Sequence, residues 1–576
     1  MSYRAPVADI CFALKHAAGL KTALAEGLYG DLDEETVETV IAEAGRFAAE
    51  VIAPLNSVGD KFGTPFKDGK VTTPPGWKEA YTAWAQAGWN GLAAPSKWGG
   101  QELPQAVNAA CIEMWNSASA AFAIGPVLTI AAVDALEAYG SDDLKQRYLG
   151  KLVSGEWMGT MQLTEPQAGS DVGALRTKAE HASDGSYRIK GSKIFITYGE
   201  HDLTDNIIHF VLARLPDAPA GTKGISLFLV PKFMPDGTRN DVRAHSVEHK
   251  MGIHASPTCT MVYGDAGGAV GFLVGEENEG MHAMFKMMNR ARLAVGLQGV
   301  GIAERATQQA INYARERKQG PAKAIVAYPD VQRMLLTMRS LTAAARVICY
   351  ATGVAIDRAE RASNEALRKT AHERASLLTP IAKAFSTDIG IEVASLGVQV
   401  HGGMGYIEET GAAQHYRDAR IAAIYEGTNG IQAQDLVMRK LPLEGGATVA
   451  LYLNELRHSV KGVLASNNPA FGNTGYRLAE LIGCLERSTQ WLLAQKSPDG
   501  ALAGATPYLR LFATAAGGCM LVDQALAATR ESGDGAARIA LARFFSENIV
   551  PQATGLERAV TEGADSVTKA QAALAG

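Results

Sequence analysis

Apolar positions recur at helical spacing in the first part of the chain, and Asp33 precedes the clearest run. From Val37 to Ile52, apolar or small residues return every three or four positions, which is the spacing of one buried helix face. An aspartate before such a run can cap its first turn. A more apolar run, Ala118–Val133, is interrupted by Pro126 and is too short to span a bilayer. The pattern therefore predicts helices from about residue 33 to 155, with the apolar run as a buried helix.

The pattern changes near Trp157, where short segments rich in β-branched and aromatic residues alternate with turn signals. The predicted strands are 158–164, 187–189, 193–197, 207–215 and 225–230. From Gly280 to about Lys440 the spacing is helical again, and Pro442 with the following Glu-Gly-Gly marks a boundary. The remaining residues suggest four or so amphipathic helices.

This order predicts an α+β multidomain protein, which the length of 576 residues can support. We expect a helical N-terminal domain over 1–156 and a central β-domain over 157–279. A helical bundle over 280–443 and an additional C-terminal helical domain over 444–576 complete the chain.

Composition narrows the classes of function. The net charge of −5 provides no basic face for nucleic acid, and no sustained basic amphipathic face suggests a membrane surface. The six cysteines are scattered without a CxxC pair, which favours a reducing compartment and no structural zinc. Charged residues interrupt the N-terminal apolar stretches, so no signal-peptide core is expected. We expect a cytoplasmic protein without nucleic-acid binding or membrane insertion.

Two stretches in the predicted β-domain could carry chemistry. Met161–Asp171 leaves a strand and enters a Pro/Gly turn, where backbone amides and hydroxyls can converge on an anion. In Lys193–Thr197, alternation places Phe195 and Thr197 on one face of a strand, which suits a flat heterocycle that needs one hydrogen bond at its edge. Taken alone, the first stretch is better explained as an ordinary strand-to-loop turn and the second as an ordinary core strand.

A third set of stretches follows in the helical bundle: 398–406, 416–420 and 424–432. Gly402 and Gly403 allow close approach of a ligand to the backbone. Glu426 follows an apolar segment and precedes a predicted helix near Asn429. A desolvated carboxylate there would be more basic, which suits proton abstraction. The alternative role is interaction with the helix N-terminus, and the local context alone favours that alternative.

The glycines from Gly299 to Glu304 nearly match a dinucleotide-binding fingerprint. No strand precedes them and the last glycine is missing, so the motif lacks its structural context. Close helix packing explains these glycines better.

In this order, the stretches resemble the acyl-CoA dehydrogenase family. The matching pieces are TEPQAGSD at 164–171, KMGIHAS at 250–256, Glu316-Arg317, HGGMGY at 401–406 and YEGT at 425–428. The N-terminal extension and the extra C-terminal domain resemble the longer subgroup, which includes 3-methylmercaptopropionyl-CoA dehydrogenases. The resemblance implies FAD-dependent dehydrogenation of a short or medium acyl-CoA to the trans-2-enoyl-CoA, with 3-methylthiopropionyl-CoA as one candidate substrate.

The resemblance also implies roles for individual positions. Glu426 would be the catalytic base. FAD would contact Leu163, Thr164, Gly169, Ser170, Phe195, Thr197 and Thr428 of one subunit, and Arg317, Gln399, Gly402 and Gly403 of its neighbour. The acyl-CoA would contact Ser170, Arg292, Tyr425 and Gly427. Each site would need two chains, hence a homodimer or a dimer of dimers, with an electron-transferring flavoprotein as the electron acceptor.

The chain departs from the family pattern in places. The family often has an aromatic residue at the position of Met161 and Trp at that of Phe195, so flavin packing can differ. The usual Phe-Gly after the arginine is replaced by Gln-Gly-Pro at 319–321. Two alternatives stay open: an acyl-CoA oxidase that passes electrons to dioxygen, and a non-catalytic assembly factor on the same scaffold. The C-terminal domain is expected to cap the core or to widen the dimer contact.

Overall fold

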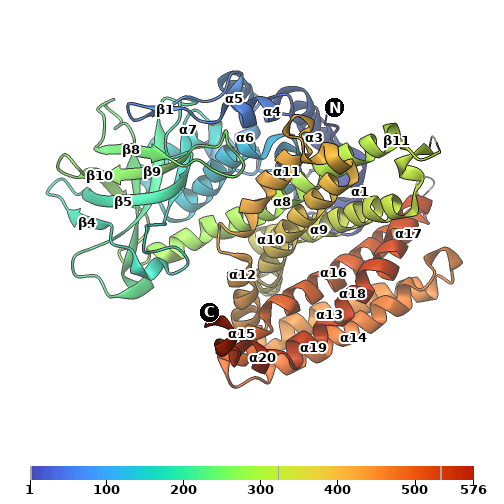
Figure 1. Ribbon diagram of the computed structural model, residues 1–576. Coiled ribbons are helices and arrows are strands. Elements are labelled where there is room, and N and C mark those ends of the chain that lie inside the picture. Colours follow the sequence, from blue (N-terminus) through green and yellow to red (C-terminus); the bar gives the residue numbers. More distant parts are fainter. Residues whose placement is uncertain (1–2, 322, 532–534, 576) are drawn as a thin grey trace.

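The N-terminal part of the computed structural model is helical; the structure describes residues 3–321, 323–531 and 535–575 (Figure 1). Its helices are α1 (Val7–His16), α2 (Leu20–Ala25), α3 (Glu34–Phe47), α4 (Leu55–Phe62), α5 (Trp77–Gln86), α6 (Gln105–Tyr139) and α7 (Asp142–Ser154), with a small hairpin of β1 (Phe66–Lys67) and β2 (Lys70–Val71). The Asp33 carboxylate accepts a hydrogen bond from the Thr36 backbone N–H at 2.8 Å, so the predicted cap of α3 is confirmed.

The apolar run around Pro126 lies inside α6, which is buried along nearly its whole length. The helix is locally broken at Ser119, whose φ of −159° and ψ of 108° are non-helical. Two helices, α6 and α16 (Ala505–Ala528), are long and apolar enough to cross a membrane, but most of each is covered by other parts of the chain. The prediction of a buried helix is confirmed for α6.

The central part is an eight-stranded sheet made of β3 (Met158–Gln162), β4 (Lys178–His181), β5 (Tyr187–Thr197), β6 (Ile207–Arg214), β7 (Ile225–Pro231), β8 (Val242–Val247), β9 (Thr258–Tyr263) and β10 (Ala269–Leu273). The strand order is β10-β7-β6-β4-β5-β9-β8, β3 joins β6 in parallel, and β10 also pairs with β5. That last pairing curls the sheet into a barrel-like shape. The two strands predicted at 187–189 and 193–197 are one strand, and β4, β8, β9 and β10 were not predicted, because cross-strand pairing selects short strands that local composition does not reveal.

The long helices of the third part are α8 (Gly280–Glu316), α9 (Pro329–Arg361) and α10 (Glu365–His401), followed by α11 (Ala412–Ala419) and α12 (Asn429–Asp435). The near-fingerprint glycines lie within α8, as expected. A Cβ at Gly299 would stand 2.3 Å from the Ser386 carbonyl oxygen of α10, so this glycine permits the two helices to touch. Close helix packing is therefore confirmed as the reason for it.

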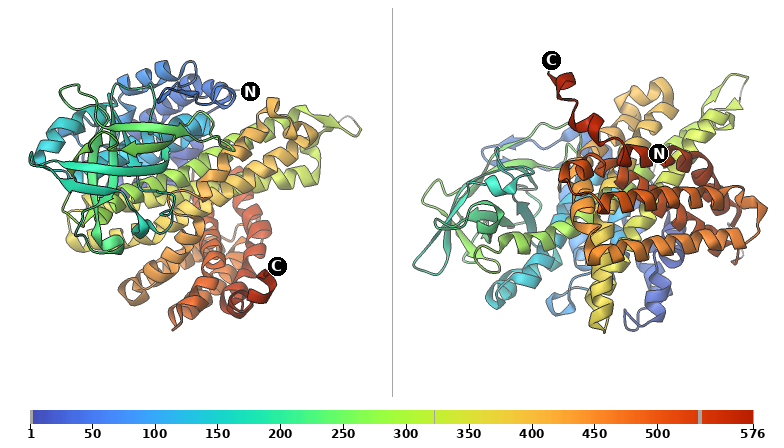
Figure 2. Two further views of the ribbon diagram at one scale, coloured as in Figure 1. Left: turned by 60° about the vertical axis from the view of Figure 1, so that its left-hand side comes forward. Right: turned by 90° about the horizontal axis from the view of Figure 1, so that it is seen from below.

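The C-terminal part is helical, as predicted. It contains α13 (Ala447–Ala465), α14 (Thr474–Leu493), α15 (Pro498–Ala503), α16, α17 (Gly535–Phe544), α18 (Val550–Thr554), α19 (Leu556–Thr561), α20 (Ala564–Thr568) and α21 (Gln571–Leu574). Helix α16 packs on α9 and α10, so this part covers one side of the helical bundle (Figure 2).

The arrangement separates the two ends of α8. Figures 1 and 2 show that α8 starts beside the β-domain and ends on the opposite side of the molecule, at the hairpin of β11 (Lys318–Gln319) and β12 (Lys323–Ala324). Residues at the two ends of this helix cannot serve one small site within a single chain.

Candidate active site

Glu426 lies in the turn between a short 3₁₀ segment (Arg420–Ala423) and α12. Its φ is +58° and that of Gly427 is +82°, so two successive residues are left-handed. A non-glycine residue in this region is held there by its surroundings, at a cost of about 1–3 kcal/mol. Such strain is common at functional sites, and here it places Glu426 in the wall of a cavity.

The cavity beside Glu426 is narrow and mostly apolar. It is lined by Asn116, Ile124, Val127 and Leu128 of α6, by Ala291, Ala294, Val295 and Gln298 of α8, and by Tyr425 and Glu426. Its volume is about 290 Å³ with the space open to solvent, and only about 10 Å³ can hold the centre of a water molecule. That is about the room one water needs.

The electrostatics suit a base. Burial raises the pKa of the Glu426 carboxyl to about 7, and the cations Arg292 and Lys383 oppose that rise. Arg292 is itself buried, and one of its terminal nitrogens lies 3.8 Å from the Asp435 carboxylate. A carboxylate that ionises near neutral pH can both accept a proton and be regenerated.

Three polar side chains share the wall of this cavity with Glu426: Asn116, Gln298 and Tyr425. The Tyr425 hydroxyl donates a hydrogen bond to the Gln298 side-chain oxygen. The Asn116 side-chain oxygen is buried without a hydrogen-bond partner among the described residues. An apolar group that covered the Asn116 oxygen would leave this atom without water or a partner, which costs free energy.

The predicted flavin-contact segments lie side by side in the sheet. The Ile194 N–H donates to the Thr164 carbonyl at 2.9 Å, and the Lys193 ammonium donates to the Leu163 carbonyl at 3.1 Å. Between Lys193 and Ile196 the register with β9 shifts by one residue, and at this bulge Phe195 has a φ of +58°. Phe195 is 59% exposed, which is unusual for an aromatic residue in a sheet and suits a flat ring stacked against it.

A buried ion pair supports the same region. The Lys193 ammonium lies 2.8 Å from the Glu165 carboxylate, and both side chains are almost fully buried. Burial would raise the pKa of Glu165, but Lys193 and the donors of Arg176 and Thr177 hold it below its ordinary value. Glu165 therefore pins the start of the turn that carries Gly169 and Ser170, both of which are exposed.

The remaining predicted residues form two further groups. Thr428 caps α12, its hydroxyl accepting a hydrogen bond from the Ile431 N–H at 3.2 Å, directly after Glu426 and Gly427. The other group is exposed at the far end of α8 and consists of Arg317, Gln399, Gly402 and Gly403. The rings of Tyr313 and His401 stack at 4.4 Å and join the ends of α8 and α10 there.

Sequence reasoning missed four buried polar residues around these segments: Asn116, Lys193, Gln298 and Lys383. A signal was present for two of them. Lys383 interrupts the apolar run of α10, and Asn116 lies in an almost wholly apolar helix. A buried polar side chain needs partners, but the sequence does not show which ones.

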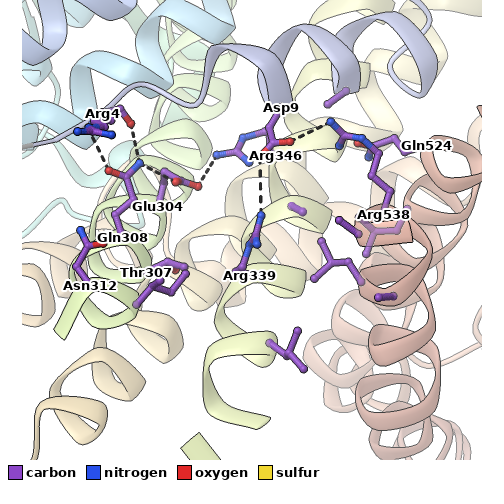
Figure 3. Close-up of a pocket in the computed structure, with 18 of the residues that line it drawn as sticks. Arg4, Asp9, Glu304, Thr307, Gln308, Asn312, Arg339, Arg346, Gln524 and Arg538 are labelled. Atoms are coloured by element: carbon purple, nitrogen blue, oxygen red, sulfur yellow. Dashed lines mark hydrogen bonds and ion pairs between the residues drawn. The ribbon is translucent and has the colours of Figure 1, made fainter. Parts of the chain in front are cut away.

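A second cavity, with a volume of about 840 Å³, lies between α8, α9 and the C-terminal helices (Figure 3). Its walls are held by ion pairs rather than by convergent unpaired groups. The Asp9 carboxylate lies 2.9 Å from Arg538, and Arg346 lies 2.8 Å from Glu304 and 2.6 Å from Glu113. We interpret it as the seam between the core and the C-terminal helices.

Comparisons with known proteins bear on these groups. Four family models match in order: acyl-CoA dehydrogenase N-terminal domain at 34–156, middle domain at 160–266, C-terminal domain at 278–441, and acetyl-CoA dehydrogenase C-terminal like at 452–571. They confirm the predicted sequence of helical, β, helical and additional C-terminal domains.

Relatives agree with the models. The 3-methylmercaptopropionyl-CoA dehydrogenase of Ruegeria pomeroyi is 45% identical, over 99% of this chain and 100% of its own length. A butyryl-CoA dehydrogenase of Syntrophomonas wolfei is 33% identical over 97% of both chains. The structure of an acyl-CoA dehydrogenase complexed with FAD from Bacillus anthracis shares the fold, with a TM-score of 0.75 at 21% identity, covering 94% of this chain and 89% of that one. The resemblance drawn from the motifs is thus confirmed, and the chain belongs to the acyl-CoA dehydrogenase family.

Proposed function

We propose that the protein is an FAD-dependent acyl-CoA dehydrogenase in which Glu426 removes the α-proton of a short acyl thioester. The observation that carries the proposal is the position of Glu426, in a left-handed turn at a narrow apolar cavity with a pKa raised to about 7. That pKa lets the carboxylate act as a base near neutral pH and hold the proton afterwards.

The exposed face of the sheet would hold the flavin. Phe195 offers an exposed ring, Leu163 and Thr164 lie on the segment hydrogen-bonded beside it, and Thr197 follows on the same strand. Gly169 and Ser170 in the exposed turn, together with Thr428, would contact the rest of the cofactor. When bound, FAD supplies the redox chemistry by accepting the β-hydrogen of the substrate as a hydride.

The chain itself would polarise and deprotonate the substrate. The backbone N–H of Glu426 donates to no group in the described part of the chain, so it is available to the thioester carbonyl. A hydrogen bond there stabilises negative charge that develops on this oxygen. The Glu426 carboxylate then takes the α-proton, the β-hydrogen leaves with its electron pair, and a trans-2-enoyl thioester remains. Tyr425 and Gly427, the neighbours of Glu426 in the chain, would contact the acyl-CoA, as would Arg292, whose charge acts on the Glu426 carboxyl.

The small volume and the polar wall of the cavity favour short acyl groups. Tyr425 and Gln298 hydrogen-bond to each other, and Asn116 adds a polar atom without a described partner. A polar or polarizable atom near the end of a short chain would be tolerated there better than a long alkyl tail. We take 3-methylthiopropionyl-CoA and butyryl-CoA as the first substrates to test.

A second subunit would complete each site. Arg317, Gln399, Gly402 and Gly403 lie at the end of α8 opposite the β-domain, so they would reach the cofactor of a neighbouring chain (Figure 1). Next to them Tyr406 is 87% exposed, together with Met404 and Ile407. An apolar exposed loop of this kind favours a homodimer or a dimer of dimers. By analogy with the family, an electron-transferring flavoprotein in the cytoplasm would accept the electrons.

The test is reduction of the bound flavin under anaerobic conditions. Wild type and Glu426→Gln are mixed with a panel of acyl-CoAs, and the visible flavin absorbance is followed. We expect the variant to retain FAD and to bind acyl-CoA without bleaching, whereas the exposed-site control Glu562→Gln bleaches like wild type. Full bleaching in Glu426→Gln would refute the assignment of the base. Peroxide formed at the turnover rate in air would indicate an oxidase, and a purified protein without flavin a non-catalytic role.

A further inference from the structure

Lys383 is a fully buried cation next to the turn that carries Glu426. It lies in the middle of α10, and its side chain has no exposed surface. The ammonium donates to the Gly427 carbonyl and to the Asn429 side-chain oxygen, both at 2.9 Å. Burying a charge is costly unless polar groups surround it. These neutral oxygens accept hydrogen bonds from two of its three N–H groups but do not neutralise its charge.

Lys383 contacts the left-handed turn that carries Glu426. Glu426 and Gly427 both have left-handed backbone conformations, and their carbonyls accept hydrogen bonds from two other elements. The Gln432 side-chain amide donates to the Glu426 and Gly427 carbonyls at 3.2 and 3.3 Å, while Lys383 approaches from α10. The Lys383 ammonium of α10 therefore stabilises the turn. As a charged donor it forms a stronger hydrogen bond than the neutral Gln432 amide does.

The charge of Lys383 also acts on Glu426. The cations that face this carboxyl are Arg292 from α8 and Lys383 from α10. Arg292 shares its charge with Asp435, which lies 3.8 Å away and is also paired with Arg439. Asn429 lies between Lys383 and Asp388: its side-chain oxygen accepts from the Lys383 ammonium, and its side-chain NH2 donates to the Asp388 carboxylate at 2.7 Å. Lys383 has no carboxylate within ion-pair distance in the described chain, and its charge acts on Glu426 first and on Asp388 second.

Lys383 remains a cation at neutral pH. Burial lowers the pKa of its ammonium to about 8, and Glu426 and Asp388 oppose that fall. The group is thus charged over the range in which Glu426 ionises. Arg292 and Lys383 are the two cations that favour the ionised form of the Glu426 carboxyl.

We infer that Lys383 is the positioning residue of the catalytic base: it fixes the left-handed turn through the Gly427 carbonyl, and its charge stabilises the ionised Glu426. The inference rests on the proposed function, since it requires Glu426 to be the base. Lys383 itself need not touch the substrate or the flavin.

The test compares variants that separate charge from contact. Lys383→Met removes both, Lys383→Gln keeps a donor without charge, and Lys383→Arg keeps the charge with a different shape. Lys369→Met, on the same helix but paired on the surface with Glu444, is the matched control. The pH dependence of kcat/KM, the separate kcat and KM values at pH 7, FAD content and Tm are measured for the FAD-loaded enzyme.

We expect the acid limb of kcat/KM to move to higher pH by about one unit in Lys383→Met and Lys383→Gln. At pH 7 kcat would fall about fivefold while KM changes little, because a rise in the pKa of the base from about 7 to about 8 lowers its ionised fraction from about one half to about one tenth. Lys383→Arg would keep the acid limb of wild type with a lower kcat, and Lys369→Met would match wild type throughout.

An acid limb that stays in place in Lys383→Met would overturn the inference, whatever happens to kcat. If Lys383→Met does not fold or loses FAD, Lys383→Gln decides on the same criterion. The outcome is distinguishable from failure of the proposed function. Flavin bleaching by Glu426→Gln would refute the base itself, whereas an inactive Glu426→Gln beside an unmoved acid limb refutes only the role of Lys383.

Discussion

The hydroxyl of Tyr425 donates a hydrogen bond to the side-chain oxygen of Gln298, across the cavity whose wall contains Glu426. The bond ties the residue preceding the proposed base to the middle of α8. It therefore couples the size of the acyl cavity to the placement of the base, since both partners line the same narrow space.

Shortening Gln298 should lengthen the preferred acyl chain. In Gln298→Ala the cavity gains the space of the Gln298 side chain, and we expect the ratio of kcat/KM for hexanoyl-CoA over butyryl-CoA to rise about tenfold, the effect of roughly one well-accommodated methylene. Gln308→Ala is the control, because Gln308 lies on the same helix and bonds to the Arg4 backbone instead. An unchanged ratio in Gln298→Ala would place the end of the acyl chain elsewhere.

Activity should depend on the ionisation of Glu426. Since burial raises its pKa to about 7, kcat/KM for a short acyl-CoA should increase with pH and reach half its plateau near pH 7. Rates with an artificial electron acceptor between pH 5 and 9 measure this directly. A half-plateau below pH 5 would mean that the carboxylate is not desolvated in the working enzyme.

The ionised Glu426 carboxylate should lower the free energy of unfolding above neutral pH. Because the pKa of Glu426 is raised on folding, its contribution favours the folded state below about pH 4.5 and is lost as pH rises through about 7. Gln does not titrate, so Glu426→Gln should gain on the order of 2 kcal/mol relative to wild type between these limits. Tm values of both proteins at pH 5 and pH 8 test this; an equal Tm difference at both pH values would contradict it.

Removing one partner of the Lys193–Glu165 pair should loosen the flavin face. Both side chains are buried, and loss of one leaves an uncompensated charge at a cost of about 3–5 kcal/mol. We expect Lys193→Met to lower Tm and to release FAD during gel filtration. The exposed pair Lys190–Glu180 on neighbouring strands provides a control: Lys190→Met should change Tm little.

Retention of FAD by Lys193→Met at wild-type affinity would show that the pair supports the sheet without shaping the flavin site. A double variant, Lys193→Met with Glu165→Leu, should recover part of the lost stability, because it removes the unpaired carboxylate as well.

What the sequence determined by itself was local. The three-four spacing of apolar residues and the Asp33 cap predicted α3, and the interrupted apolar run predicted that α6 is buried. Motifs separated by hundreds of residues indicated the family, because their order along the chain is a property of the sequence. Local context around Glu426 could not choose between a base and a helix-end carboxylate.

Tertiary structure decided the chemistry of the site. Burial raises the pKa of Glu426, and Arg292 of α8 and Lys383 of α10, which lie far from it in sequence, oppose that rise. The left-handed φ of Phe195 occurs at a register shift against β9, and the cavity wall joins Tyr425 to Gln298 of α8 by a hydrogen bond. The desolvation of a carboxyl, the electrostatic effect of nearby charges and backbone strain all depend on residues that are close in space. The order of residues along the chain does not show which residues those are.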